Sequence, residues 1–378
     1  MTDKLLRLYI EPSSRCNLEC KMCFRNTWIG ESFSDMEMSV FLNAIDSMPD
    51  SVQTVFFGGM GEPLLNKDIL AMVEYAANRG VKTNLLTNGT LLTRALSADL
   101  LDKGLDMLWV SIDSFDEDGY ESIRRKSSFE LVRRNIEDFQ AEASRRRNAA
   151  GQSDNEKSAE LGLAFVAMKS NVTQLGKLKR FADEYGVSEI NISNVSPTDY
   201  SSQSESLFTR VVMLELDSKT PGNKRINLPA MDDRLEGVSE GITSLLGTDF
   251  FNDAPEKMTA ERRRRYCRFI NDGITFVRHD GQVAPCMALL HTGMTYIRDK
   301  LRTVHHHSFG NVRKQGLSDI WGSEEYTSFR ARVRDFDFSP CVQCGGCDLR
   351  DENRADCFGN EKPTCGACLW SEDVLNCP

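Results

Sequence analysis

The sequence predicts an α/β fold in which parallel strands alternate with covering helices and are followed by a module rich in cysteine. Three observations support this prediction. Apolar runs alternate with amphipathic stretches from residue 5 to about 195, no cysteine occurs between residues 24 and 266, and nine of the 12 cysteines lie between residues 267 and 377. A chain of 378 residues is long enough for one large domain with an extension, or for two domains.

Six strands are expected, each a short apolar or β-branched run of the kind found in a parallel strand covered on both faces. Their ranges are 6–11, 52–58, 81–87, 107–112, 161–168 and 189–195. Helices are expected between them at 40–48, 66–79, 94–103, 130–147 and 173–185. Gly80, Gly104 and Gly186 each follow one of these helices and are expected to be C-cap glycines. Such parallel sheets bind ligands at the carboxyl ends of their strands.

The segment boundaries follow changes in composition. Residues 1–195 carry the alternating pattern, residues 196–265 form a connector with short helices, and residues 266–378 are rich in cysteine and glycine. Within the connector, a helix is expected at about 204–216, and the run 262–265 is interpreted as a solvated helix face. The polar stretch 148–160 predicts a loop.

Composition and charge exclude several classes of protein. The formal net charge of −10 argues against a nucleic-acid partner, because such partners are bound by basic surfaces. No apolar run approaches the length of about 18 residues that a membrane span requires. The amino-terminal residues lack the pattern of a signal peptide, so we expect a cytoplasmic protein with reduced thiols. Ligation of metal or of iron–sulfur clusters therefore explains the cysteines better than disulfides do.

The first cysteines follow the first strand. Cys16, Cys20 and Cys23 have the spacing C-x3-C-x2-C. A zinc site normally has four protein ligands, and no nearby histidine completes this set. A 4Fe–4S cluster can instead be held by three thiolates that leave one iron open to another ligand. The alternatives are free thiols in a loop or an incomplete zinc knuckle.

A glycine motif follows the second strand in the run FFGGMGEPLLN. Because glycine lacks a Cβ atom, the backbone there can come close to a ligand. A carboxylate lies at the same strand end, and a proline stiffens the exit. The residues in question are Gly58, Gly59, Gly61, Glu62 and Pro63. Later strands also end in polar residues, namely Asn88, Ser111, Asp113, Asn171, Asn194 and Ser196.

The triad and the glycine motif together resemble the radical S-adenosylmethionine (radical SAM) enzymes. The resemblance implies a partial (β/α)6 TIM-like barrel, with a 4Fe–4S cluster on the triad thiolates and SAM on the open iron. It assigns SAM binding to the glycine motif. Asn88, Ser111, Asp113 and Asn171 are further candidates for contacts with SAM. Met22 stands where the family usually has an aromatic residue, and Met60 is an insertion in the motif.

The carboxyl-terminal module is similar to the SPASM extension of radical SAM enzymes, which implies an auxiliary-cluster domain. Cys267 precedes an expected hairpin over 274–285, and Cys286 ends it. The remaining cysteines, which depart from the usual SPASM spacing, are Cys341, Cys344, Cys347, Cys357, Cys365, Cys368 and Cys377. Nine thiolates suffice for two auxiliary 4Fe–4S clusters and leave one over. Zinc is the alternative, because C-x2-C pairs also form zinc knuckles.

The resemblance implies reductive cleavage of SAM to a 5′-deoxyadenosyl radical that abstracts hydrogen from a substrate, with flavodoxin or ferredoxin as the reductant. The substrate would be a peptide, a protein or a cofactor precursor. The carboxyl-terminal run favours the maturases associated with tungsten-containing aldehyde oxidoreductases, and anaerobic sulfatase maturation is an alternative.

Two other classes of function explain the sequence less well. A non-catalytic iron–sulfur or zinc scaffold, or an electron-transfer protein, would leave the glycine motif without a role. A flavin or nicotinamide oxidoreductase would need a G-x-G-x-x-G motif after the first strand, where the triad stands instead.

Overall fold

The computed structural model describes residues 3–149, 159–208, 218–219, 225–232, 234–246, 266–297, 300–342 and 347–378. Several expectations fall outside these residues. They are most of the loop expected at 148–160, the second half of the helix expected at 204–216, the basic run 262–265, and Cys344.

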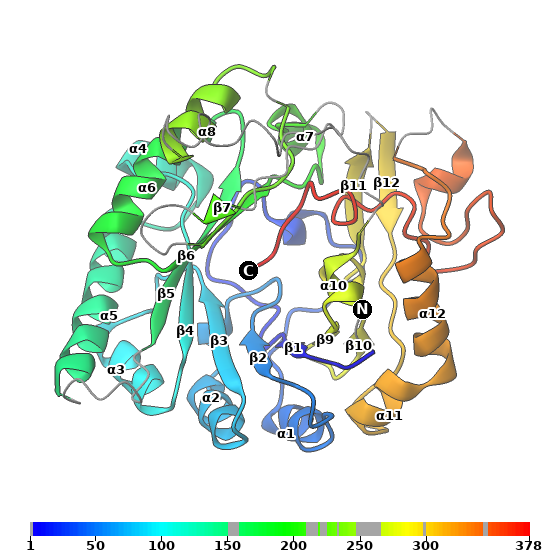
Figure 1. Cartoon of the computed structure of the whole chain (residues 1–378), viewed down its shortest axis with the longest axis horizontal. Coiled ribbons are helices and arrows are strands. Elements are labelled where there is room, and N and C mark those ends of the chain that lie inside the picture. The colour runs from blue at the N-terminus through cyan, green and yellow to red at the C-terminus, as the bar shows by residue number, and fades with distance from the viewer. Residues whose placement is uncertain are drawn as a thin grey trace.

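The six expected strands are confirmed and form the centre of one parallel sheet (Figure 1). They are β1 Arg7–Ile10, β2 Thr54–Phe57, β3 Lys82–Thr87, β4 Met107–Ser111, β5 Glu160–Ala167 and β6 Glu189–Asn194. Each of these strands pairs with its neighbours in chain order, and each pair is parallel. All six carboxyl ends therefore meet at one edge, where the sequence predicted the site.

The sheet continues beyond both of its expected ends, in the order β10-β9-β1-β2-β3-β4-β5-β6-β8-β7. The expected hairpin is present as β9 Ile274–Val277 and β10 Val283–Ala284, and β9 lies parallel to β1. At the other end, β8 Arg225–Asn227 is parallel to β6 and carries β7 Ser218–Lys219. The sequence pattern predicted the hairpin but not its place beside β1.

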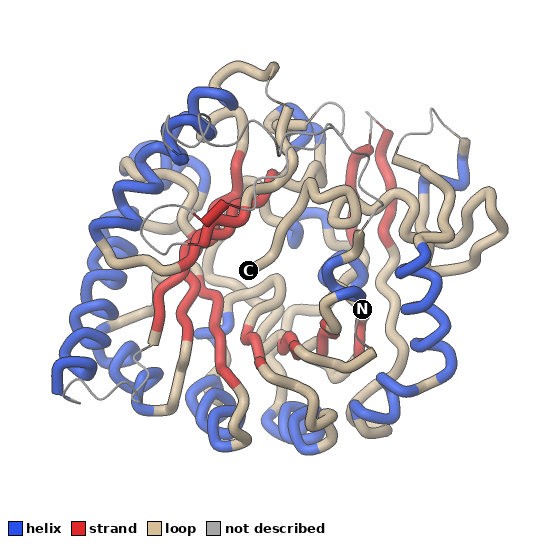
Figure 2. The backbone as a smooth tube through the Cα atoms, viewed as in Figure 1, coloured by secondary structure: helices blue, strands red, loops and turns tan. Residues whose placement is uncertain are grey.

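Helices cover the outer side of the sheet, which gives the partial barrel shape that Figure 2 shows. They are α1 Met38–Asp46, α2 Ile69–Asn78, α3 Arg94–Asp102, α4 Glu117–Ile123, α5 Phe129–Ala149 and α6 Leu175–Glu184. Buried apolar faces of these helices and of the strands form one continuous core. The C-cap expectation is confirmed, because Gly80, Gly104 and Gly186 all have positive φ angles.

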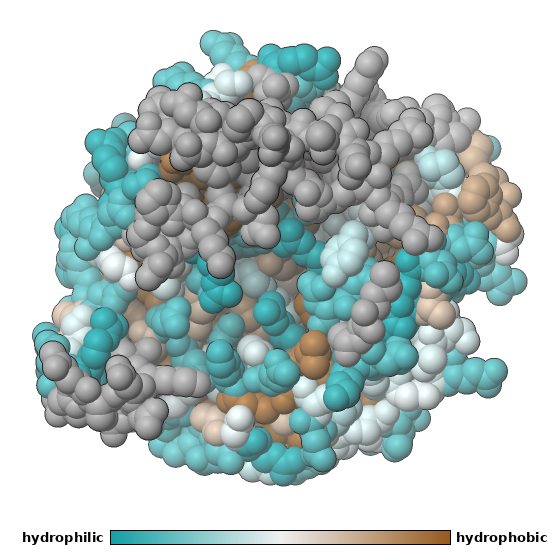
Figure 3. Space-filling view, viewed as in Figure 1, coloured by the Kyte–Doolittle hydropathy of each residue, from teal (hydrophilic) through white to brown (hydrophobic). Residues whose placement is uncertain are grey.

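The remaining elements are short. The remaining α-helices are α7 Tyr200–Ser204, α8 Val238–Leu246, α10 Arg268–Asn271, α11 Leu317–Gly322 and α12 Glu324–Asp335. The 3-10 helices are η1 Phe24–Thr27, η2 Pro63–Leu65, η3 Val172–Gln174, η4 Met287–Leu289 and η5 Asp348–Asp351, and β11 Gly293–Ile297 pairs with β12 Lys300–Val304. Among the described residues, no helix has both the length and the apolar character that a bilayer crossing requires. Hydrophilic residues cover most of the coloured surface on the face in Figure 3.

Candidate active site

A cavity of about 250 Å³ lies at the carboxyl ends of the central strands. We call it the triad cavity. Its wall contains the three amino-terminal thiols together with parts of the glycine motif and several strand-end residues. The predicted residues in the wall are Cys16, Cys20, Cys23, Gly58, Gly59, Gly61, Glu62, Asn88, Ser111, Asn194 and Ser196. Pro63, Asp113 and Asn171 do not line it.

The triad loop is held in place by backbone contacts. The Lys21 amide donates to the carbonyl of Ile123 at 2.9 Å, and the side-chain amide of Asn26 donates to the carbonyl of Cys20 at 3.0 Å. Burial raises the pKa of the Cys16 thiol and raises that of Cys20 to about 11. Buried thiols of this kind remain protonated at neutral pH unless a metal centre stabilises the thiolate.

The number of thiols favours a cluster over a zinc ion. A tetrahedral zinc ion with bonds of about 2.3 Å holds its sulfur ligands roughly 4 Å apart. Among the described residues, however, three ligand atoms lie within 4.8 Å of one another only at Glu11, His279 and His291. The triad thiols are not among such groups, and they number three where a structural zinc ion takes four protein ligands. A cubane fits this arrangement, because each thiolate binds a different iron.

The glycine motif packs directly on the triad loop. A Cβ atom on Gly61 would lie 2.2 Å from the carbonyl oxygen of Ser13 and 2.5 Å from that of Arg15. The next amide, that of Glu62, donates to the Arg15 carbonyl at 2.7 Å. Here the missing Cβ atom lets two stretches of the chain meet, so the motif fixes the position of the triad as well as lining the cavity.

We expect Gly61→Ala to lower the free energy of unfolding by about 1–3 kcal/mol, because the new methyl group overlaps backbone atoms that have little room to move. The same displacement should weaken SAM cleavage. Gly322→Ala is the matched control, since a Cβ atom there meets nothing within 4 Å. Thermal unfolding of both variants checks the prediction, and equal melting temperatures would contradict it.

The carboxylate of Glu62 accepts its hydrogen bonds from other groups of the protein. It accepts hydrogen bonds from the hydroxyl of Thr87 at 2.8 Å, the amide of Asn88 at 2.8 Å and the amide of Leu64 at 3.0 Å. Burial raises the pKa of Glu62, although these three donors oppose the rise. The side chain therefore ties the glycine motif to the end of β3.

The Asn88 side chain continues this connection toward the triad. Its amide group donates to the Asn17 side chain at 2.9 Å and lies 3.7 Å from Cys16 Sγ. Asn88 thus contacts the thiol directly and positions the loop that carries it.

Asp113 and Asn171 connect the ends of β4 and β5. Asp113 accepts from the amide of Val166 at 2.7 Å and pairs with Arg124 at 2.7 Å. The Asn171 side chain donates to the carbonyls of Asp113 and Val166, both at 2.9 Å. The polarity of these residues was visible in the sequence, but the direction in which they point was not.

Arg124 is a cavity residue that the sequence analysis did not identify. It is buried, lines the triad cavity and lies close enough to Cys20 for their charges to interact. Burial lowers the pKa of Arg124, but the charges of Asp113 and Cys20 raise it by more. The pKa of Arg124 therefore lies above its ordinary value. A single arginine in a helical segment gave no signal of this role.

Four carboxyl-terminal thiols form a second cluster of side chains, which we call the auxiliary thiol group: Cys267, Cys286, Cys365 and Cys368. Burial raises the pKa of each thiol, and for Cys267, Cys286 and Cys365 the charges of neighbouring thiols add to the rise. The pKa of Cys267 reaches about 12. Four buried thiols can hold either a 4Fe–4S cluster or a zinc ion.

Arg302 lies beside the auxiliary thiol group and was also missed in the sequence. Burial lowers its pKa, while the charges of Cys368, Cys341 and Cys365 oppose that change. It donates to the carbonyls of Ala367 and Glu352, both at 3.2 Å. A buried guanidinium here offsets the negative charge that thiolates bring.

The other predicted ligands lie elsewhere. Cys341 is adjacent to the group, since a Cβ atom on Gly366 would lie 3.5 Å from its sulfur. Cys347 and Cys357 are exposed. Cys377 lies in the wall of the triad cavity, where burial raises its pKa to about 11.

A smaller cavity of about 80 Å³ extends from the triad cavity to the auxiliary thiol group. We call it the connecting cavity. Residues shared with the triad cavity include Phe24, Met60, Met287 and Trp370, and its far wall includes three of the four auxiliary thiols. Phe24 and Trp370 stack with ring centroids 5.9 Å apart. The two thiol sites therefore face one largely apolar passage.

The comparisons with known proteins agree with this arrangement. Residues 10–147 match the radical SAM superfamily, and residues 267–348 match the SPASM iron–sulfur cluster-binding domain. A tungsten-containing aldehyde ferredoxin oxidoreductase cofactor-modifying protein of Pyrococcus furiosus is 29% identical over 98% of this chain and 96% of that protein. A PqqA peptide cyclase of Granulibacter bethesdensis is 24% identical over 93% of this chain and 81% of that protein.

Two solved structures share the fold. SuiB of Streptococcus suis bound to precursor peptide SuiA has a TM-score of 0.58 at 15% identity and covers 91% of this chain and 70% of that one. Native anSMEcpe with bound AdoMet has a TM-score of 0.55 at 16% identity and covers 97% of this chain and 95% of that one. Identities this low establish the fold alone.

Proposed function

We propose that this chain is a radical SAM enzyme with a SPASM iron–sulfur domain and that it modifies a cofactor or cofactor precursor of a tungsten-containing oxidoreductase. The observation that carries the general activity is the meeting of three thiols and the glycine motif in one cavity. When bound there, the reduced cluster and SAM supply the 5′-deoxyadenosyl radical that removes hydrogen from a substrate.

The residues of the chain supply positioning and exclude water. Cys16, Cys20 and Cys23 hold the cluster in this proposal, and Asn88 and Glu62 fix the loops around it through the contacts described above. The apolar side chains in the wall, including Phe56, Phe165, Leu86, Met287 and Trp370, keep the cavity dry. A dry cavity protects a reactive radical from quenching by solvent.

We propose that Cys267, Cys286, Cys365 and Cys368 bind one auxiliary 4Fe–4S cluster. Cys341, Cys344, Cys347 and Cys357 then remain for a second. The division into residues 1–195, 196–265 and 266–378 stays part of the proposal. Flavodoxin or ferredoxin would act as the reductant in the cytoplasm, where thiols are kept reduced.

The cofactor substrate is favoured by similarity along the whole chain. The Pyrococcus furiosus relative covers both thiol sites and the segment between them.

The direct test is anaerobic turnover of the reconstituted protein with dithionite and SAM. Cofactor extracted from a tungsten oxidoreductase produced without this protein should stimulate 5′-deoxyadenosine formation by about tenfold or more and change in mass. A stimulation equal to that of buffer would overturn the cofactor proposal.

A peptide or protein substrate is the second candidate, and the similarity to the PqqA peptide cyclase favours it. Anaerobic sulfatase maturation falls in this class. Parallel reactions with peptides carrying a sulfatase-type cysteine distinguish the two, because only the true substrate class should gain or lose mass in step with 5′-deoxyadenosine.

A further inference from the structure

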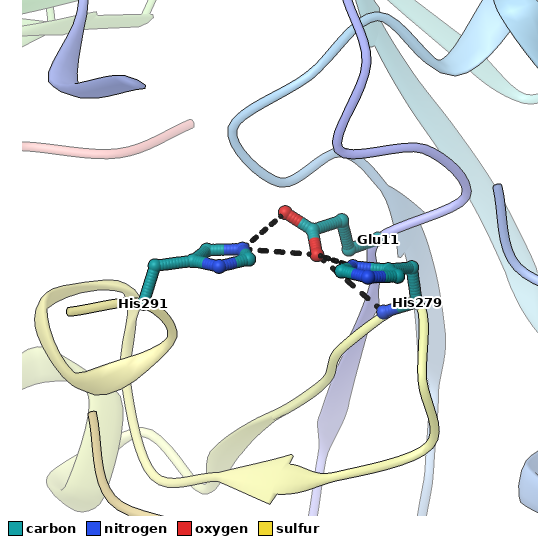
Figure 4. Close-up of side chains that lie close together, drawn as sticks. All are labelled: Glu11, His279 and His291. Atoms are coloured by element: carbon teal, nitrogen blue, oxygen red, sulfur yellow. Dashed lines mark hydrogen bonds and ion pairs between the residues drawn. The ribbon is translucent and has the colours of Figure 1, made fainter. Parts of the chain in front are cut away.

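We propose that Glu11, His279 and His291 bind one divalent first-row transition-metal ion, separate from the iron–sulfur clusters. None of the three lines the triad cavity, although His291 lies in the wall of the connecting cavity, and the proposed function gives them no role. Two imidazoles and one carboxylate are a ligand set that holds zinc or non-haem iron(II) in proteins. Figure 4 shows the three side chains converging on one point.

The sheet register brings the ligands together. Ile10 at the end of β1 is aligned with Val277 at the end of β9, and the amide of Glu11 donates to the Val277 carbonyl at 3.0 Å. His279 therefore emerges at the same edge as Glu11, although 268 residues separate them in the chain. His291 reaches the same point from the segment after η4.

The distances suit a single ion. His279 Nδ1 lies 2.9 Å from Glu11 Oε2, and His291 Nε2 lies 2.8 Å from Glu11 Oε1. One ligand atom from each of the three residues lies within 4.8 Å of the other two. An ion with bonds of about 2.0–2.2 Å needs its ligand atoms roughly 3–3.5 Å apart, so small side-chain shifts are enough.

The far side of His291 is organised as it is for a metal-binding histidine. Its Nδ1 lies 3.0 Å from Glu31, which also accepts from the amide of Thr292 at 2.8 Å and pairs with Arg278 at 3.2 Å. An Nδ1–H group that donates to a carboxylate leaves the Nε2 lone pair free to bind a metal. The Trp28 ring stacks on the imidazole with centroids 3.9 Å apart and fixes its plane.

Burial makes this arrangement more than a surface ion pair. The side chains of Glu11, His279 and His291 are 1%, 3% and 1% exposed. Glu11 also contacts the glycine motif, because the amide of Met60 lies 3.3 Å from its Oε1 and a Cβ atom on Gly59 would lie 2.6 Å from its Cγ. A metal ion here would fasten the glycine motif to the β9–β10 hairpin.

Zinc binding to the reconstituted full chain tests the proposal. After removal of adventitious metal, we expect about one zinc per chain in the unaltered protein and at least about tenfold less in His291→Gln and Glu11→Gln, with iron and sulfide unchanged. Glu31→Gln should weaken zinc affinity by about 10- to 100-fold, since it only orients His291. His305→Gln, in a partly exposed pair with Glu352, is the control and should bind zinc as before.

Zinc K-edge X-ray absorption of the unaltered protein gives a second measurement that does not depend on folding of the variants. Nitrogen and oxygen neighbours without sulfur would support the site. A sulfur shell would assign the zinc to cysteines and overturn the proposal, as would equal zinc content in the unaltered protein and His291→Gln. Failure of the unaltered protein to bind zinc, iron(II) or manganese(II) would overturn the proposal and show that Glu11, His279 and His291 form a buried ion-pair network.

Discussion

We expect replacement of Cys16, Cys20 and Cys23 by alanine to remove about four irons per chain and to reduce 5′-deoxyadenosine formation by roughly a thousandfold or more. The three thiols line the triad cavity, and three thiolates can hold a 4Fe–4S cluster that leaves one iron open to another ligand. Iron and sulfide analysis together with anaerobic assays of SAM cleavage measure both effects.

The control for this variant is Ser39→Ala, which alters an exposed side chain away from the cavity wall. It should leave SAM cleavage unchanged. Retention of full SAM cleavage by the triple variant would contradict the assignment of the triad, and unchanged iron content would show that the amino-terminal thiols hold no cluster.

The second large effect is expected at the auxiliary thiol group. Cys286→Ala combined with Cys368→Ala should also remove about four irons, but should leave SAM cleavage without substrate largely intact. Iron loss and SAM cleavage are expected to respond differently because these thiols lie at the far end of the connecting cavity and not in the wall of the triad cavity. Substrate modification should fall by about a hundredfold or more, if the auxiliary cluster takes part in turnover.

Zinc analysis decides between the two metals at this site. Loss of zinc and not iron from the double variant would identify a zinc knuckle. A variant that loses SAM cleavage and substrate modification equally would indicate that the auxiliary thiols support the whole fold and not a separate step.

Features that depend on local sequence were predicted well. The strands and their order follow from apolar runs, and the triad and the glycine motif each lie within one short segment. Gly61 illustrates why the motif is informative, since only a residue without a Cβ atom fits against the carbonyls of Ser13 and Arg15.

Features that depend on distant pairing were not predictable from this sequence. Glu11 and His291 are 280 residues apart, and only the pairing of β1 with β9 explains their contact. Likewise, Asp113 and Asn171 end strands as expected, but the Asn171 side chain binds the Asp113 carbonyl and the Asp113 carboxylate binds Val166 and Arg124, so neither lines the cavity. The spacing of the late cysteines also left their grouping open, and the burial of Cys365 and Cys368 beside Cys267 supports the grouping proposed above.

The position of β1 between β2 and β9 has a consequence for protein engineering and for evolution. The amino-terminal and carboxyl-terminal thiol sites are attached to adjacent strands in fixed register, so a one-residue insertion in β9 would shift one redox centre relative to the other. Separate expression of the amino-terminal part would leave β1 as an uncovered edge strand that is prone to aggregation. We therefore expect grafted or shuffled versions of this enzyme to work only when the crossover points leave the pairing of β1 with β9 intact.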